Sequence, residues 1–402
     1  MCNELQIQPV ISLQREAGVG YYFLPPNQVF KSKALMKQIV VITRAKFWLQ
    51  GAGFWARSRE MLKFLSRQAR VNVIYMGPLL KRDISLLRQF EGPIKFIWIG
   101  QPGKDEVPEI YWKDQFEKIS GRLPEAEIYF IDQISNSFML DVLPYETWEG
   151  QARPRFIVDM HDLVSARTIK HQRYKIQEQF PLSTDEERQI LDRYDAVICI
   201  QQNEFNQVVQ WIGESKCLLV PHPLEPRPQL IREKARNIGF VASRWHANVN
   251  GLNRFIKKVW PRLAERGVYL HLHGFIAERF KETSDPQIVP NGYCWDLHRC
   301  YEHMDIMINP VFYGAGLKIK SVEAMAHGLP LVTTEEGASG LEHLDGSALL
   351  IARSDQQFAN ILIELIDDKA RRERLAQQAI NYVTDHLSEQ HCFTPLEKFL
   401  NT

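Results

Sequence analysis

The sequence has few cysteines, no long apolar run and almost no net charge, and each of these absences excludes a class of protein. Six of its 402 residues are cysteine, and no two of them form a C-x-x-C pair. A disulfide framework is therefore not expected, and a reducing, cytoplasmic compartment is the better prediction. No apolar stretch reaches the roughly 18 residues that a membrane-spanning helix needs. The first residues lack the basic start and apolar run of a secretory signal.

The formal net charge of +1 gives no indication of a nucleic acid or an acidic partner. One region departs from this balance, because the range from Lys31 to Arg88 holds thirteen Lys and Arg residues against two acidic ones. Together with Phe47, Trp48, Phe54 and Trp55, this basic region could contact an anionic membrane surface. The alternative is a solvated helix face beside buried aromatic residues. No nucleic-acid-binding module is recognisable.

Short apolar runs rich in β-branched residues alternate with amphipathic segments along most of the chain. The length of 402 residues and the apolar content of 45% suit two or three domains. Continuous apolar strands between helices predict parallel sheets covered on both faces, an α/β fold that binds ligands beyond the carboxyl ends of its strands. The expected strands are residues 38–43, 71–75, 95–99, 128–131, 156–160, 196–200, 218–220, 237–241, 269–272, 305–308 and 331–333.

A proline-rich segment divides the chain. Val220–Pro228 contains four prolines in nine residues, which disfavours helix and predicts a linker. We therefore expect an N-terminal extension over residues 1–35, an N-terminal domain over 36–225 and a C-terminal domain over 226–388. The last stretch, 389–402, is expected to form a helix that returns to the N-terminal domain.

Residues 309–330 carry the most specific chemical signal. A predicted strand leads into the loop of Gly314, Ala315 and Gly316, and a helix is expected over residues 317–327. The glycines let a ligand approach the backbone closely. The start of a helix offers free N–H groups and a positive dipole end, and this combination binds phosphate.

Charged residues lie on the first turns of this predicted helix. Lys318 and Lys320 add two cations beside the expected phosphate site, and Glu323 can accept hydrogen bonds from the two hydroxyl groups of a ribose. The alternative is an amphipathic helix with surface lysines, because a G-x-G sequence before a helix is weak evidence alone.

This segment and the strand and loop after it, residues 331–341, resemble the nucleotide-binding element of glycosyltransferase family 4, the group 1 glycosyltransferases of GT-B fold. Residues 292–297, followed by Tyr301, fit the same pattern, and the resemblance extends over 237–352. It implies two Rossmann-like doubly wound parallel-sheet domains facing a cleft. The N-terminal domain would bind the acceptor, and the C-terminal domain would bind a nucleotide sugar.

The resemblance also implies roles for residues of the C-terminal domain. The donor diphosphate is expected on basic side chains and on the glycine loop: Arg244, Lys318, Lys320, Gly314, Ala315 and Gly316. The ribose is expected on Glu323, and the base on the backbone of Gly292, Tyr293 and Cys294. Many members carry a first glutamate where this chain has Ala315. Recognition of the donor sugar would then fall partly to the loop amides.

Two features of the N-terminal half complete the expected site. Gly51 and Gly53 follow a predicted strand, and the resemblance puts such a loop against donor phosphate or acceptor. An ordinary strand–helix turn is the alternative. Asp159, His161 and Asp162 form a D-x-H-D sequence at another strand end. The resemblance puts His161 near the attacked carbon of the donor sugar, with the two aspartates orienting it or binding acceptor. A histidine without a functional role is the alternative.

The activity that the resemblance implies is a retaining glycosyl transfer that needs no metal ion and no cofactor. The candidate catalytic residues are His161, Asp159, Asp162 and Lys320. Basic side chains and the helix start would stabilise the leaving diphosphate, and closure of the two domains would exclude water. The expected substrates are a nucleotide-diphospho-sugar and a glycan or lipid-linked acceptor in surface polysaccharide synthesis. The expected location is the cytoplasm, with peripheral contact to the inner face of the membrane as an option.

Other functions are weighed against this one. A nonhydrolysing nucleotide-sugar epimerase and a non-catalytic nucleotide-binding relative would have the same fold, but the spacing of Lys318, Lys320 and Glu323 favours the transferase. A hydrolase is not expected, because no G-x-S-x-G elbow is present. The spacing of one further group fits no structural zinc pattern: Cys294, His298, Cys300 and His303.

Overall fold

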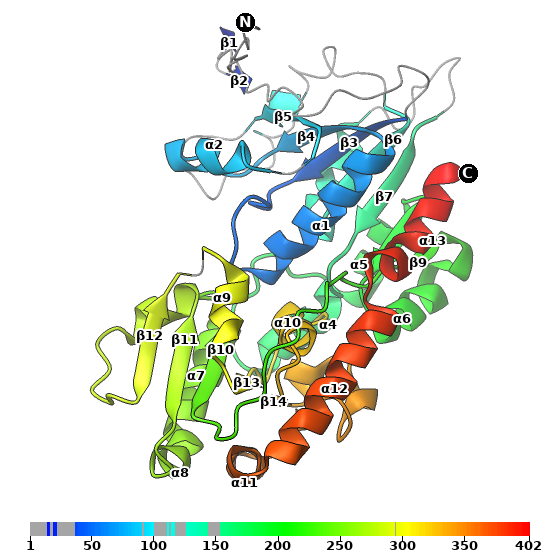
Figure 1. Cartoon of the computed structure of the whole chain (residues 1–402). Coiled ribbons are helices and arrows are strands. Elements are labelled where there is room, and N and C mark those ends of the chain that lie inside the picture. Colours follow the sequence, from blue (N-terminus) through cyan, green and yellow to red (C-terminus); the bar gives the residue numbers. More distant parts are fainter. Residues whose placement is uncertain are drawn as a thin grey trace, which may run out of the picture.

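The computed structural model describes residues 14–16, 19–21, 37–90, 92–99, 111, 114–116, 126–143, 153–293 and 295–402. These residues form two α/β domains, each built on a parallel sheet (Figure 1). Of the expected N-terminal extension, the structure describes two short antiparallel strands, β1 (Gln14–Glu16) and β2 (Val19–Tyr21). The other residues of 1–35 lie outside the described residues.

Seven parallel strands form the sheet of the N-terminal domain, in the order β5-β4-β3-β6-β7-β8-β9. They are β3 (Gln38–Thr43), β4 (Arg70–Tyr75), β5 (Ile94–Trp98), β6 (Ile128–Asp132), β7 (Arg155–Asp159), β8 (Ala196–Cys199) and β9 (Cys217–Leu219). The described helices are α1 (Gly53–Gln68), α2 (Lys81–Leu87), η1 (Ile134–Asp141), α4 (Val164–Arg173), α5 (Thr184–Asp192), α6 (Gln202–Ile212) and η2 (Glu214–Lys216). Apolar side chains point to both faces of the strands, so helices must cover both faces.

The C-terminal domain has a six-stranded parallel sheet in the order β12-β11-β10-β13-β14-β15. The strands are β10 (Asn237–Val241), β11 (Tyr269–His273), β12 (Ile288–Gly292), β13 (Ile306–Asn309), β14 (Leu331–Thr333) and β15 (Leu350–Ile351). The helices are α7 (His246–Lys258), α8 (Trp260–Ala264), η3 (Phe275–Phe280), α9 (Leu297–Glu302), α10 (Ile319–Ala326), η4 (Glu336–Ala338), η5 (Glu342–Leu344), α11 (Asp355–Asp367), α12 (Lys369–His386) and α13 (Glu389–Asn401).

Each sheet has a separate apolar core on either face. In the N-terminal domain, one core includes Leu191 of α5 and Val208 of α6, and the other includes Leu65 of α1. In the C-terminal domain, α7, α8 and α11 cover one face, and α9, α10 and α12 cover the other. Both sheets are therefore doubly wound, which is the α/β fold predicted from the apolar strands.

The last helix, α13, packs against the N-terminal domain (Figure 1). The rings of Phe393 and Phe64 are stacked with their centroids 4.3 Å apart, and Leu396 is fully buried. Arg155 of β7 donates a hydrogen bond of 2.9 Å to the carbonyl of Phe399. Burial of each large apolar side chain stabilises such a contact by roughly 1.5–3 kcal/mol. The chain thus crosses between the domains twice, at the proline-rich segment and after α12.

Most of the predicted strands lie within a residue or two of the observed ones, but the short strands β1 and β2, and β12 and β15 of the C-terminal sheet, were not predicted. β12 contains Pro290, Asn291 and Gly292, residue types that weaken a strand signal. β15 has only two residues. Helix α10 begins at Ile319 rather than at residue 317, because Lys318 has an extended backbone and is the N-cap residue.

Candidate active site

A cavity of about 360 Å³ lies between the two domains. Its walls come from the segments that follow β3, β6, β7 and β8 on one side and β10, β12 and β13 on the other, so the carboxyl ends of both sheets face it. The expected site residues in its lining are Gly51, Gly53, His161, Asp162, Ala315, Gly316, Lys318, Lys320 and Glu323. The tertiary structure therefore brings together residues that are up to 272 positions apart, counting from Gly51 to Glu323.

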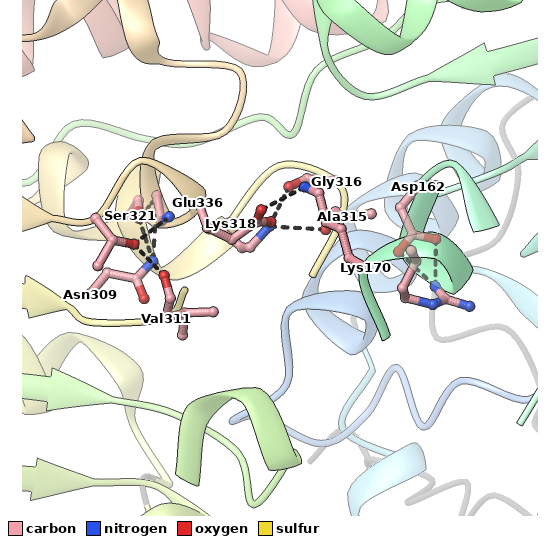
Figure 2. A network of polar contacts seen from close by, with 12 residues as sticks. Asp162, Lys170, Asn309, Val311, Ala315, Gly316, Lys318, Ser321 and Glu336 are labelled. Atoms are coloured by element: carbon pink, nitrogen blue, oxygen red, sulfur yellow. Dashed lines mark hydrogen bonds and ion pairs between the residues drawn. The ribbon is translucent and has the colours of Figure 1, made fainter. Parts of the chain in front are cut away.

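Lys318 holds the glycine loop rather than pointing freely into the cavity. Its ammonium group donates to the carbonyls of Ala315 and Gly316, at 3.0 and 2.9 Å, and to Glu336 at 2.8 Å (Figure 2). The other carboxylate oxygen of Glu336 accepts a hydrogen bond of 2.6 Å from Lys170 of the N-terminal domain. The charge of Lys318 is thus largely balanced by Glu336, which reduces its expected contribution to binding a diphosphate.

Lys320 is the less balanced cation of the pair. It donates to the side-chain oxygen of Asn248, and its ammonium group lies 5.3 Å from the centre of the Phe240 ring. Burial and the nearby charge of Lys318 lower the pKa of Lys320 to about 7. An anion in the cavity would restore the charge of this lysine, so the geometry suits a phosphate group beside it.

Glu323 lies one turn further along α10, and its side chain is almost fully buried. One carboxylate oxygen accepts a hydrogen bond of 3.0 Å from the hydroxyl of Tyr301. Burial raises the pKa of Glu323, while Tyr301, Arg59 and Lys320 oppose that rise. The tyrosine fixes the carboxylate at the cavity wall, where it can still accept hydrogen bonds from a ligand.

His161 lies just beyond the end of β7, in a left-handed backbone conformation with φ of 65°. Its Nε2 atom is 2.7 Å from Asp132 and 3.8 Å from Asp159. Although burial acts in the opposite direction, these two carboxylates raise the pKa of His161. Non-glycine residues rarely adopt this backbone conformation, and here it turns the imidazole toward the cavity and Asp132.

Asp132 was not predicted as a site residue, although it ends strand β6 at the same sheet edge. It is buried and also accepts hydrogen bonds from Thr43 at 2.5 Å and Ser58 at 2.7 Å. His161 and these hydroxyl groups lower the pKa of Asp132 against the opposing effect of burial. The sequence shows Asp132 only as an aspartate at the end of an apolar run. This indicates a site residue only once the neighbouring strand, β7, and the histidine after it are known.

The two aspartates around His161 differ in position. Asp159 is fully buried and forms an ion pair with Arg57, with 2.8 Å between its Oδ2 atom and Nε. It therefore lies behind His161 rather than in the cavity lining. Asp162 does line the cavity, where both of its oxygens are 2.6 Å from Arg167. Arg167 also binds Glu178 at 2.9 Å.

Several contacts connect the two domains around the cavity. The Tyr293 hydroxyl group is 3.1 Å from the backbone nitrogen of Gln50 and 3.0 Å from its carbonyl oxygen. The side chain of Gln50 accepts a hydrogen bond of 3.2 Å from the backbone of Leu297. Gly53 lies so close to Ile319 that an added Cβ atom would be 3.2 Å from the Cβ atom of that residue. The two domains are therefore in direct contact along the rim of the cavity.

Some expected residues lie outside the cavity lining. Arg244 forms an ion pair with Glu278 at 3.1 Å, lies over the ring of Phe275, and has a side chain that is 58% exposed. These contacts hold its guanidinium group away from the cavity. Gly292, Tyr293 and Gly314 are also absent from the lining. Cys294 lies outside the described residues.

Arg59 is a cavity residue that sequence reasoning did not single out. It lies on α1 and donates hydrogen bonds to the carbonyls of Phe47 and Leu49. Burial lowers its pKa, and the charge of Glu323 opposes that effect. It was part of the basic run from Lys31 to Arg88, and nothing in the sequence distinguishes it from the other cations of that run.

The aromatic residues of the described basic region are buried to different degrees, with Phe54 41% exposed and Trp55 half-buried. Phe47 is fully buried and Trp48 is 8% exposed, and both belong to the core of the N-terminal domain. Arg57 is buried against Asp159, and Lys46 pairs with Asp83 at 3.2 Å. The alternative reading, a helix face beside core aromatic residues, fits these contacts. Lys31 lies outside the described residues.

Within the described residues, one group has ligand atoms close enough together to consider a metal ion. These atoms belong to Asp132, Asp159 and His161 and lie within 4.8 Å of one another. The guanidinium of Arg57 already neutralises Asp159, and Asp132 already accepts three hydrogen bonds. This arrangement suits an ion-paired network better than a cation site. No helix in the described ranges is long and apolar enough to cross a membrane.

Comparison with known proteins finds a family model that matches part of the C-terminal domain, and solved structures that share the fold. Residues 235–368 match the family model described as "Glycosyl transferases group 1". A curated relative, an uncharacterized 44.6 kDa protein in the cps region of Klebsiella pneumoniae, is 22% identical over 224 residues. That alignment covers 52% of this chain and 57% of the relative. This chain therefore matches only a little over half of the relative's length.

Two solved structures share the whole architecture. Sucrose-phosphate synthase from Thermosynechococcus elongatus matches with a TM-score of 0.65 and 12% identity, over 91% of this chain and 98% of that one. HepE from Anabaena, solved with UDP and glucose, also matches with a TM-score of 0.65, at 13% identity, over 92% of this chain and all of that one. The GT-B fold and the resemblance to group 1 glycosyltransferases, both predicted from the sequence, are confirmed.

Proposed function

We propose that this chain, which carries a group 1 glycosyl transferase domain on a GT-B fold, moves a sugar from a nucleotide-diphospho-sugar to a glycan or lipid-linked acceptor. One observation carries the proposal. Lys320, with its lowered pKa, and the buried carboxylate of Glu323 lie on the first turns of α10 and line a cavity between two facing sheets. A cation at a helix start suits a diphosphate, and a carboxylate can accept hydrogen bonds from the hydroxyl groups of a ribose.

The donor would bind with its diphosphate at the start of α10. The first N–H groups and the dipole of this helix would act together with Lys320 on the phosphate oxygens. Glu323, fixed by Tyr301, would accept hydrogen bonds from the ribose hydroxyl groups. His161 would then lie on the sugar side of the diphosphate, on the opposite wall of the cavity.

The reaction that suits this site is a front-face substitution that retains the anomeric configuration. The bond between the sugar C1 atom and the diphosphate oxygen breaks, and the acceptor oxygen forms the new bond to C1 from the same face. The acceptor proton passes to the leaving phosphate oxygen. The described carboxylates in and behind the cavity wall are already engaged: Asp132 by His161, Asp159 by Arg57, Asp162 by Arg167 and Glu323 by Tyr301. This engagement disfavours a covalent nucleophile.

The same contacts support a metal-independent reaction. The charge that develops on the leaving diphosphate would meet Lys320 and the amino end of α10, which are fixed before the reaction begins. Lys318 would act by holding the loop through its bonds to Ala315 and Gly316. His161 would bind the donor sugar near C1, and its contact with Asp132 would orient the imidazole ring.

Two relatives support a biological setting and a nucleotide. The Klebsiella relative is encoded in a cps region, which supports a role in polysaccharide synthesis. HepE was solved with UDP and glucose, which makes UDP the first nucleotide to test. The acceptor and the sugar are proposed as classes.

The first test is binding. The purified chain would be screened by thermal shift with UDP, GDP, ADP and CMP, followed by calorimetry with the best ligand. We expect one nucleoside diphosphate to stabilise the fold clearly. If no nucleotide binds, the proposal is wrong and a non-catalytic relative of the fold is favoured.

The second test separates transfer from epimerisation. The chain would be incubated with a radiolabelled nucleotide sugar, with and without acceptor glycans. A transferase needs an acceptor for rapid turnover, whereas an epimerase converts the donor without one. Epimerised donor in the absence of acceptor would contradict the proposed function.

A further inference from the structure

A buried carboxylate of the N-terminal domain contacts the glycine loop of the C-terminal domain. Glu204 lies on the first turn of α6 and is 5% exposed. Its Oε1 atom accepts a hydrogen bond of 3.1 Å from the backbone N–H of Gly316 and a longer one of 3.4 Å from Leu163. The first bond crosses from one domain to the other, and 112 positions of sequence separate its two residues.

We propose that Glu204 is a positioning residue that latches the glycine loop to the N-terminal domain and holds the donor site closed. The inference rests on the proposed function, because it concerns the loop beside the donor diphosphate. Glu204 itself is absent from the cavity lining, whereas Gly316 is part of it. The carboxylate therefore acts on the donor through the loop and not by contact.

The packing around Gly316 shows why a hydrogen bond at this point holds the two domains together. Gly316 has a φ of 72°, and an added Cβ atom would lie 2.9 Å from the Cβ atom of Asp162 and 3.0 Å from the carbonyl oxygen of His161. The backbone of the loop thus touches the segment that carries His161. Separation of the domains by a small distance would break both this contact and the bond to Glu204.

The direction of the Gly316 amide also revises the role expected for the loop. Its N–H group is already used by Glu204 and points into the N-terminal domain. It is therefore not free to bind the donor in the closed cleft. The loop amide that was expected to bind the donor sugar serves instead to join the domains.

The carboxylate and the amide form a pair that is unfavourable to separate. Burial raises the pKa of Glu204 to about 7, and the charge of Asp162 adds to this rise, whereas Lys318 opposes it. In its ionised form the carboxylate accepts a hydrogen bond that contributes more than a neutral one. Loss of the bond would lower the fraction of molecules in the closed state. The apparent affinity for donor falls by that fraction, whereas saturating donor restores closure. The Michaelis constant should therefore change and the turnover number should not.

The chain offers a matched control in Glu187 of α5. This side chain is fully buried and accepts backbone hydrogen bonds from Val164 and Ser165, at 2.8 and 2.9 Å. These hydrogen bonds, and one from the Ser165 hydroxyl group, lie within the N-terminal domain. Removal of Glu187 tests the loss of a buried carboxylate beside α4, without loss of an interdomain bond.

The experiment compares Glu204→Ala, Glu204→Gln and Glu187→Ala by hydrogen exchange and by calorimetry with UDP. In Glu204→Ala we expect exchange of residues 314–319 to be about tenfold faster and the dissociation constant for UDP to rise about tenfold, as loss of a hydrogen bond to a charged group allows. Glutamine keeps an acceptor but has no charge. In Glu204→Gln we therefore expect both the exchange rate and the dissociation constant to rise about threefold, between the wild type and Glu204→Ala. Glu187→Ala should lower the melting temperature without either change.

Unchanged exchange of residues 314–319 in a folded Glu204→Ala protein would overturn the latch. If that variant does not fold, the isosteric Glu204→Gln carries the same comparison. The exchange measurement needs no nucleotide, so it still decides about the latch if the wild-type chain binds no nucleotide and the proposed function fails. In an activity assay, a fall in the turnover number with an unchanged Michaelis constant would also contradict the proposal.

Discussion

The imidazole of His161 and the carboxylate of Asp132 are joined by a contact of 2.7 Å between Nε2 and Oδ1. Asp132 ends β6, His161 lies two residues beyond the end of β7, and these two strands pair in parallel register. The contact orients the histidine at the wall of the cavity, and it stabilises the imidazolium form.

Asp132→Asn should therefore lower both the pKa of His161 and the turnover number. The amide has no negative charge, so the protonated imidazole loses stabilisation. We expect turnover to fall about tenfold or more, since a hydrogen bond to a charged group contributes about 1.5–3 kcal/mol. NMR titration of His161 and initial rates would measure the two effects. Asp141→Asn, which alters an exposed aspartate paired with Arg193, is the control and should change neither.

Lys320 should make donor binding depend on pH. Its pKa is lowered to about 7 in the empty site, so the side chain is charged at pH 6 and mostly neutral at pH 8.5. A bound diphosphate favours the charged form, so binding at pH 8.5 must take up a proton and is weaker. Each pH unit above the pKa reduces the affinity by up to about tenfold.

Calorimetry with UDP-glucose at pH 6 and pH 8.5, in buffers of different ionisation enthalpy, would detect this proton uptake. Lys320→Met should bind weakly at both pH values and lose turnover, with the fold intact. The exposed Lys258→Met is the control. Wild-type activity in Lys320→Met would contradict the proposed donor site.

Gly316→Ala should weaken donor binding by more than its effect on stability. The methyl group would lie 2.9 Å from Asp162 and force the domains apart, and the positive φ of 72° adds strain of roughly 1–2 kcal/mol. Gly346→Ala shares the positive φ, at 83°, but has no atom within 4 Å of the added methyl group. We expect similar losses of melting temperature in the two variants. Only Gly316→Ala should bind UDP more weakly, by at least about tenfold. Equal affinity of the two variants for UDP would show that the cleft does not close on this loop.

Glu323→Gln should reduce the discrimination between a ribonucleotide and its dideoxy analogue. The carboxylate, held by Tyr301 at 3.0 Å, is proposed to accept hydrogen bonds from the 2′ and 3′ hydroxyl groups. The wild type should bind UDP about tenfold or more tightly than 2′,3′-dideoxy-UDP. The variant should bind the two with similar affinity, as measured by competition. If the variant still prefers UDP to the dideoxy analogue as strongly as the wild type does, the ribose does not bind at Glu323.

Particular residues show how far the sequence could predict the site. The glycine loop, Lys320 and Glu323 lie on one short segment, whose pattern suits a phosphate-binding helix start and whose resemblance to group 1 glycosyltransferases gave their expected roles. His161 was found from a D-x-H-D sequence at a strand end. Asp132 and Arg59 were missed, because each becomes informative only through a neighbour that is distant in sequence, His161 for one and Glu323 for the other.

The sequence by itself determined the two parallel sheets, the proline-rich division of the chain and the helix start beside the cavity, since these depend on apolar periodicity and on local backbone chemistry. Only the tertiary structure decided how the charges are used. Two lysines two positions apart have different roles, because Glu336 and Lys170 meet at one of them, whereas Asn248 and a buried wall surround the other. The Gly316 amide meets Glu204 rather than the cavity. Hydrogen bonds and desolvation act over a few ångströms in space, and sequence distance does not measure those.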